Sequence, residues 1–136
     1  MTYYIRYLLT DEKPITLEDI EQAVQPFGAE YEVDGEYLVF HEEIIGQMDI
    51  IAPGHDFFKD EIQLLIEFAE QKQSKDLLLS EFGRVQSLLT IKVVFMLEHD
   101  TIFQALNPLL DWLLANRKGL LVDEGGYFQN QSGDLE

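Results

Sequence analysis

The chain has 136 residues, 46% of them hydrophobic, which is a length typical of one domain with a buried core. It contains no cysteine, which excludes disulfides, thiolate zinc sites and cysteine catalysis. Nine Lys and Arg residues against 26 Asp and Glu residues give a formal net charge of −17, a balance that disfavours binding to nucleic acids and to anionic membranes.

The chain opens on a segment rich in Tyr, Ile and Leu, residues 2–9, which predicts a strand. Aromatic residues are enriched at interface centres, so Tyr3, together with Arg6, would be free for an interface if Tyr4 points inward. The segment lacks the basic and apolar regions of a signal peptide, and no apolar run approaches the roughly 20 residues of a membrane span. We therefore expect a cytoplasmic protein.

A helix is predicted next. Thr16 has the position of its N-cap, and Asp19 stands three residues later, where it can serve the amides of the first turn. Pro26 and Gly28 predict its end.

The dipeptide Asp34-Gly35 lies between two alternating segments and predicts a hairpin with strands over residues 29–33 and 36–41. Residues 44–52 predict either a further strand or an irregular extension of the hairpin. Pro53-Gly54 ends this region.

A second helix is predicted from Phe57 to about Gln73, with Asp56 as its cap and a wide apolar face. Residues 74–83 fit either a continuation of this helix or a loop. Gly83 can act as a terminator.

The stretch 84–97 is the best candidate for the central strand. Six of its apolar residues share one parity, the period of two that marks a strand with one buried face, and towards the end Val94 and Met96 make the second face apolar too. The six are Val85, Leu89, Ile91, Val93, Phe95 and Leu97. A competing helix would contain Gly83 and run into a β-branched segment, so we favour the strand.

A last helix is predicted after Thr101, which has capping-box spacing to Gln104. Pro108 removes one internal hydrogen bond, so we expect a kink there or a fresh start with Asn107 as cap. A short hairpin is predicted over residues 120–128. The domain would then span residues 1–128, followed by a polar, frayed tail at 129–136.

The predicted order of elements is β-α-β-β-α-β, followed by a C-terminal helix and hairpin. We therefore predict an α+β fold of ferredoxin-like arrangement, in which helices back an antiparallel sheet. This arrangement says little about activity.

The charge is unevenly distributed, because no Lys or Arg occurs between Lys13 and Lys59. Eleven carboxylates in this interval have no local counter-charge. Either they form a solvated acidic face or they dock a basic partner. The candidate partner-binding residues are Glu30, Glu32, Asp34, Glu36, Glu42 and Glu43.

Each of the three histidines has acidic neighbours near a predicted element end. If two of these ends met, imidazole and carboxylate could hold a divalent metal. The candidate ligands are His41, Glu43, His55, His99 and Asp100. Their spacing matches no established ligand motif, and the simpler interpretation is that they are loop residues without a metal. Serine-hydrolase and phosphate-binding motifs are absent from the sequence, and we expect no cofactor.

Two hypotheses of function follow. The first is a non-enzymatic protein-interaction module, forming a homodimer, whose carboxylate-rich N-terminal half docks a basic partner. The alternative is a metal-assisted hydrolase built from the histidine–carboxylate loops. The first requires the carboxylates to share one surface, and the second requires at least two histidines to converge.

Overall fold

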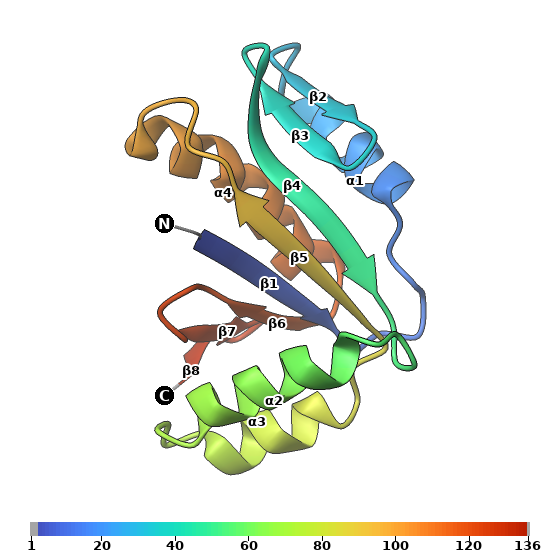
Figure 1. Cartoon of the computed structure of the whole chain (residues 1–136), viewed down its shortest axis with the longest axis vertical. Helices are drawn as coiled ribbons and strands as arrows, with labels where there is room; N and C mark the ends of the chain where they lie inside the picture. Colours follow the sequence, from blue (N-terminus) through green and yellow to red (C-terminus); the bar gives the residue numbers. More distant parts are fainter. Residues whose placement is uncertain (1–2, 136) are drawn as a thin grey trace.

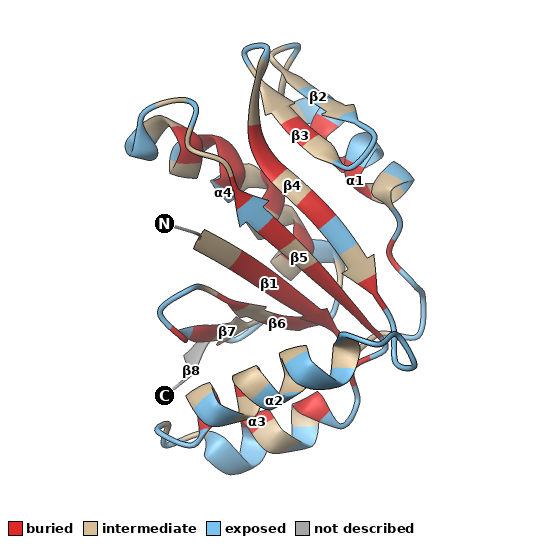
Figure 2. Ribbon diagram, viewed as in Figure 1, coloured by how far each residue is buried: buried red, intermediate tan, exposed pale blue. Residues whose placement is uncertain are grey.

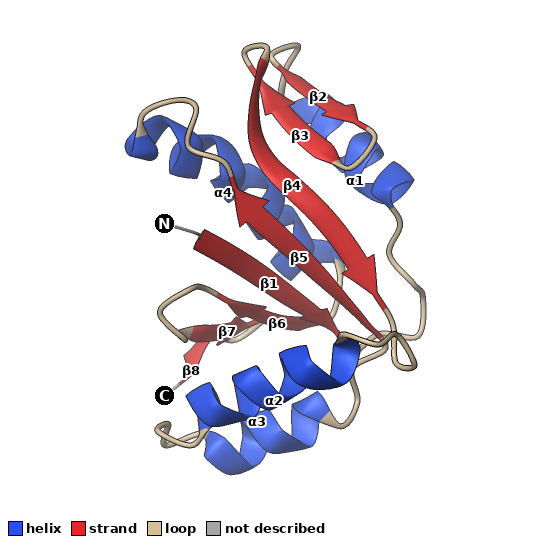
Figure 3. Ribbon diagram, in the orientation of Figure 1, coloured by secondary structure: helices blue, strands red, loops and turns tan. Residues whose placement is uncertain are grey.

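The computed structural model describes residues 3–135 of the chain, in which strands and helices alternate (Figures 1 and 3). In chain order the elements are β1 (Tyr3–Leu9), α1 (Leu17–Val24), a 3₁₀ helix η1 (Gln25–Phe27), β2 (Tyr31–Asp34), β3 (Tyr37–Phe40), β4 (Glu43–Ile51), α2 (Phe58–Ala69), α3 (Lys75–Phe82), β5 (Ser87–Val93), α4 (His99–Asn116), β6 (Gly119–Val122), β7 (Phe128–Asn130) and β8 (Gly133–Leu135).

The strands form one antiparallel sheet in the order β2-β3-β4-β5-β1-β6-β7, with the short β8 beside β7 at the edge. The central pair, β1 and β5, runs from Tyr3 opposite Val93 to Leu9 opposite Ser87. The predicted α+β class, with helices backing an antiparallel sheet, is confirmed.

The strand order is not clearly the ferredoxin-like one that we predicted. The difference lies at the centre of the sheet, where β5 lies between β4 and β1, whereas the ferredoxin-like order places the first strand between the third and the last. Residues 43–51 form a full strand, β4, that separates the β2–β3 hairpin from β5, and α2 is followed by a separate helix, α3. The hairpin is thereby pushed to the edge of the sheet.

The central strands are largely buried (Figure 2). Their side chains point alternately to the two faces of the sheet and join two apolar clusters, one on each face. Ile5, Tyr7 and Leu9 of β1 join the cluster under α1 and α4, whereas Leu8 joins the cluster under α2 and α3. Full burial of such a side chain contributes about 1.5–3 kcal/mol. The sheet is therefore held by helices on both sides.

The strand predicted within residues 84–97 is confirmed as β5, but it is shorter at both ends. Val85 precedes β5 and packs in the cluster under α2 and α3, and Phe95 follows β5 at the margin of the other cluster. At its start, β5 begins opposite the last residue of β1, because Ser87 pairs with Leu9. The side chains that alternate into the cluster under α1 and α4 are Leu89, Ile91 and Val93.

The predicted start of α1 is confirmed. Thr16 Oγ1 accepts a hydrogen bond from the Asp19 amide at 3.1 Å, and the Asp19 carboxylate accepts one from the Thr16 amide at 3.0 Å. After Val24 the chain tightens into the 3₁₀ helix, which contains Pro26, and Gly28 follows with φ +142°.

The β2–β3 hairpin is confirmed, with its turn one residue later than predicted. Asp34 pairs with Tyr37, so the turn residues are Gly35 and Glu36. Gly35 takes φ +61°, which glycine adopts without strain. The next turn, between β3 and β4, places His41 and Glu42 at φ 51° and 65°, in the left-handed region that glycine normally fills.

Two predicted helix caps are wrong. The N-cap of α2 is Phe57 rather than Asp56, and the Phe57 amide donates to Nδ1 of His55 at 3.2 Å. The N-cap of α4 is Glu98, so Thr101 lies inside the first turn. In both helices the N-cap is therefore a different residue from the polar one that the sequence suggested.

The remaining open points concern helix continuity and the chain end. Residues 74–83 contain a separate helix, α3. Helix α4 runs without a fresh start through Pro108. The predicted C-terminal hairpin is confirmed as β6 and β7, but residues 129–135, predicted to be frayed, are paired in β7 and β8. Among the described residues, no helix is long and apolar enough to cross a bilayer.

Candidate functional site

Helices α2 and α3 cover one end of a sheet face. The uncovered end of that face is polar, and β4, β5 and β1 lie side by side there. The cross-strand row Gln47–Lys92–Tyr4 lies next to the row Asp49–Thr90–Arg6. The next row is apolar and contributes to the cluster under α2 and α3; it consists of Ile51, Leu88 and Leu8. The helices thus cover only the apolar end of this face.

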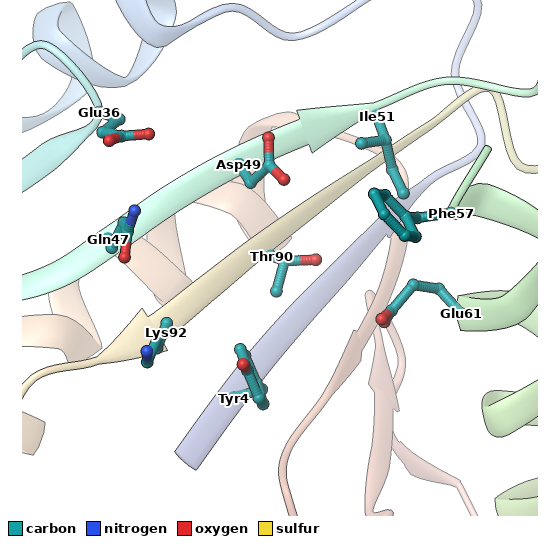
Figure 4. Close-up of a pocket in the computed structure, with 9 residues that line it drawn as sticks. All are labelled: Tyr4, Glu36, Gln47, Asp49, Ile51, Phe57, Glu61, Thr90 and Lys92. Atoms are coloured by element: carbon teal, nitrogen blue, oxygen red, sulfur yellow. The ribbon is translucent and has the colours of Figure 1, made fainter. Parts of the chain in front are cut away.

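A hollow of about 480 Å³ lies over the polar rows (Figure 4). We call it the open-face hollow. Glu36 reaches it from the β2–β3 turn, and Phe57 and Glu61 reach it from α2 and its N-cap. Its lining consists of Tyr4, Glu36, Gln47, Asp49, Ile51, Phe57, Glu61, Thr90 and Lys92.

Arg6 lies in the floor of this region and is not free for an interface. The residue is only 5% exposed, and its Nε donates to Oε2 of Glu61 at 2.6 Å. Its guanidinium carbon lies 5.1 Å from the centre of the Tyr4 ring. Tyr4 therefore faces the hollow, and Tyr3 packs with Phe103 beneath α4. The parity of β1 is the reverse of the one that would free Tyr3.

The open-face hollow is lined by groups of both charges. Glu36, Asp49 and Glu61 contribute three carboxylates, of which Glu61 is paired with Arg6, and Lys92 contributes an ammonium group. Phe57 is 65% exposed and gives its margin an apolar surface. The hollow therefore suits a polar ligand with a cationic part.

The predicted partner-binding carboxylates all lie on one hairpin at the sheet edge. We call residues 30–43 the acidic hairpin. Glu32 and Asp34 belong to β2, the edge strand, and Glu43 begins β4. Glu30, Glu32 and Glu42 line one shallow hollow of about 440 Å³ beside His41, whereas Glu36 lines the open-face hollow. Glu32, Asp34, Glu36 and Glu42 are exposed.

The three histidines lie on three different segments. His41 is in the β3–β4 turn against Phe40, His55 precedes α2, and His99 begins α4, with its ring 4.3 Å from that of Phe95. Glu43 lies at the start of β4, two residues after His41, and Asp100 follows His99 in the first turn of α4. Within residues 3–135, no three His, Asp or Glu side chains gather in a way that could hold a metal ion. No observation favours the metal-assisted hydrolase.

Several residues of the open-face hollow were not predicted to be site residues. Thr90 and Lys92 alternate with the apolar residues of 84–97, and this polar side of the strand was the signal for an uncovered face. Asp49 interrupts an apolar run in the same way. Their convergence with Glu61, however, depends on strand order.

Comparisons with family models, with curated proteins and with solved structures gave no significant match for this chain.

Proposed function

We propose that the chain is a non-enzymatic protein-interaction module that binds a basic segment of a partner through the acidic hairpin. The observation that supports this is the gathering of six carboxylates on residues 30–43, in an interval, residues 14–58, that contains no Lys or Arg. Unpaired like charges on one exposed element repel each other. A cationic partner relieves that repulsion and is steered towards the element.

A second explanation of the same charges is edge protection. Strand β2 is the edge of the sheet, and charged side chains on an edge strand discourage pairing with another copy. This explanation needs charges on β2 itself. It does not need Glu36 and Glu42, which lie in the turns on either side of β3. The docking proposal accounts for Glu42, which shares one hollow with Glu30 and Glu32, whereas Glu36 lines the open-face hollow instead.

Binding of decalysine by isothermal titration calorimetry tests the proposal. The variant Glu32→Gln/Asp34→Asn/Glu42→Gln removes three hairpin charges. The matched control, Glu67→Gln/Glu70→Gln/Asp111→Asn, removes three exposed carboxylates from α2, the residue after it, and α4. Both variants have the same net charge.

We expect the hairpin variant to bind decalysine roughly tenfold more weakly and the control to bind almost as tightly as the wild type. Equal weakening in both variants would show that only the net charge matters. Absence of binding by the wild type at physiological salt would also contradict the proposal.

We also propose that the chain forms a homodimer. The acidic β2 edge repels a second copy of itself, so the open sheet face with the exposed Phe57 is the better surface for self-association. Light scattering after size exclusion should give twice the monomer mass, and Phe57→Ser should reduce it to one. A monomeric wild type at high protein concentration would contradict this.

A further inference from the structure

A cleft of about 350 Å³ lies between the acidic hairpin and α4, on the side of the sheet opposite the open-face hollow. We call it the aromatic cleft. One wall is aromatic and consists of Phe27, Tyr31 and Phe40. The other wall is contributed by Ala105 and Pro108 of α4.

The aromatic wall is held in a fixed arrangement. The ring centres of Phe27 and Tyr31 are 5.5 Å apart, and those of Tyr31 and Phe40 are 4.9 Å apart. The Tyr31 hydroxyl donates to the Ala105 carbonyl at 2.8 Å, which ties the wall to α4. The faces of aromatic rings carry partial negative charge and attract cations.

A carboxylate stands at the margin of the same cleft. Glu30 lines it and has no ion-pair partner among the described residues. Its side chain lies over Gly28, where an added Cβ would be 2.5 Å from Oε2. Burial of the Tyr31 ring, together with the nearby Glu30 charge, raises the pKa of the Tyr31 hydroxyl. The Glu30 carboxylate is therefore close enough to the aromatic wall to interact with it electrostatically.

The α4 wall of the cleft contains Pro108, which has no N–H to donate to the Gln104 carbonyl four residues earlier. Both residues line the cleft. The three aromatic rings and the carboxylate together favour a ligand with positive charge.

We propose that the aromatic cleft binds an arginine side chain of the basic partner. A guanidinium is planar, stacks on aromatic rings and donates in several directions, which matches this combination better than the compact ammonium of lysine. An anion would meet Glu30, and a purely apolar group would cover Glu30 without giving it a donor. This inference rests on the proposed function and names the side chain that anchors the partner.

Titrations followed by ¹H–¹⁵N NMR test the inference with a capped Gly-Arg-Gly peptide and its citrulline analogue, which keeps the shape but lacks the charge. We expect the arginine peptide to shift amides of residues 27–31 and 101–107 and the citrulline peptide to bind roughly tenfold more weakly. Glu30→Gln and Phe40→Leu should each weaken arginine binding severalfold. The control Glu67→Gln, on an exposed site of α2, should leave it unchanged.

Equal binding of the citrulline peptide, or shifts outside the cleft, would overturn the inference, as would the absence of shifts at tens of millimolar peptide. Decalysine and decaarginine binding by the same variants separates the two proposals. If Glu30→Gln and Phe40→Leu bind decaarginine as the wild type does while the triple hairpin variant does not, the hairpin docks the partner but the aromatic cleft is not its anchor. If no variant and no wild-type chain binds either peptide, the proposed function itself fails.

Discussion

The Tyr7 hydroxyl joins three parts of the chain, and its removal should change both the stability and its dependence on pH. Tyr7 is 2% exposed. Its hydroxyl lies 3.2 Å from the carbonyl of Leu113, and it also hydrogen-bonds to the Arg117 carbonyl at the end of α4. Nε2 of Gln131, in the β7–β8 turn, donates to it at 3.0 Å. Chiefly because of burial, the pKa of Tyr7 is raised from 10.0 to about 12.

The variant Tyr7→Phe loses these hydrogen bonds, and we expect the free energy of unfolding to fall by about 1–2 kcal/mol near neutral pH. The pH dependence has a definite sign. The folded chain keeps the Tyr7 proton to higher pH than the unfolded chain, so this stabilisation is complete below pH 10 and is lost as the pH rises towards 12. A shift of two pKa units corresponds to about 2.7 kcal/mol.

Urea unfolding, followed by Trp112 fluorescence at several pH values up to 12, measures this difference. The advantage of the wild type over Tyr7→Phe should shrink across the alkaline range and then reverse. The control Tyr127→Phe, which alters a side chain in a residue 63% exposed, should keep the wild-type profile. A difference between wild type and Tyr7→Phe that stays constant with pH would refute the reasoning.

Four further predictions concern the stability of the fold, and each is measured by urea unfolding. Ser87→Ala should stabilise the chain by about 1 kcal/mol, because the buried Ser87 hydroxyl has no hydrogen-bond partner within the described residues; a loss would show that it does have one. Glu42→Gly should stabilise by about 1 kcal/mol by relieving φ 65°, and an unchanged stability would argue against strain in that turn. Gly119→Ala should destabilise by about 2 kcal/mol or more, because its Cβ would lie 2.2 Å from the Leu8 carbonyl oxygen; Gly83→Ala, whose nearest contact is 3.5 Å, is the control and should be nearly neutral. Hydrogen bonding to Arg117 lowers the pKa of Asp11. The contribution of Asp11 to the free energy of unfolding is therefore present above the unfolded pKa near 3.8 and is lost as the pH falls through the lower folded value. Asp11→Asn should make the stability depend less on pH in the acid range, and an unchanged dependence would contradict this.

Local features of the fold could be predicted from the sequence where the responsible residues are neighbours. The Thr16 capping box and the Asp34-Gly35 hairpin are of this kind, because each depends on side chains within a few positions. The caps of α2 and α4 were wrong because a polar residue near a helix start identifies the cap only if the preceding turn ends there. The pairing of β8 with β7 was missed although it is local, because these short strands lack the apolar alternation that predicts a strand.

The candidate sites divide in the same way. The acidic hairpin could be predicted because its carboxylates are close in the sequence and share one local element. The open-face hollow could not be, because it needs the register that sets Gln47 and Tyr4 on either side of Lys92, together with the position of α2. The aromatic cleft requires Phe27 and Tyr31 to face Pro108, about 80 residues away along the chain, a contact that only the packing of α4 creates.

The most direct test of the central claim is to map where a basic peptide contacts the chain. In a ¹H–¹⁵N NMR titration with decaarginine at physiological salt, we predict that the largest shifts fall on the acidic hairpin and the adjoining part of α4. Shifts centred on α2 and α3, or spread evenly over the surface, would contradict the account.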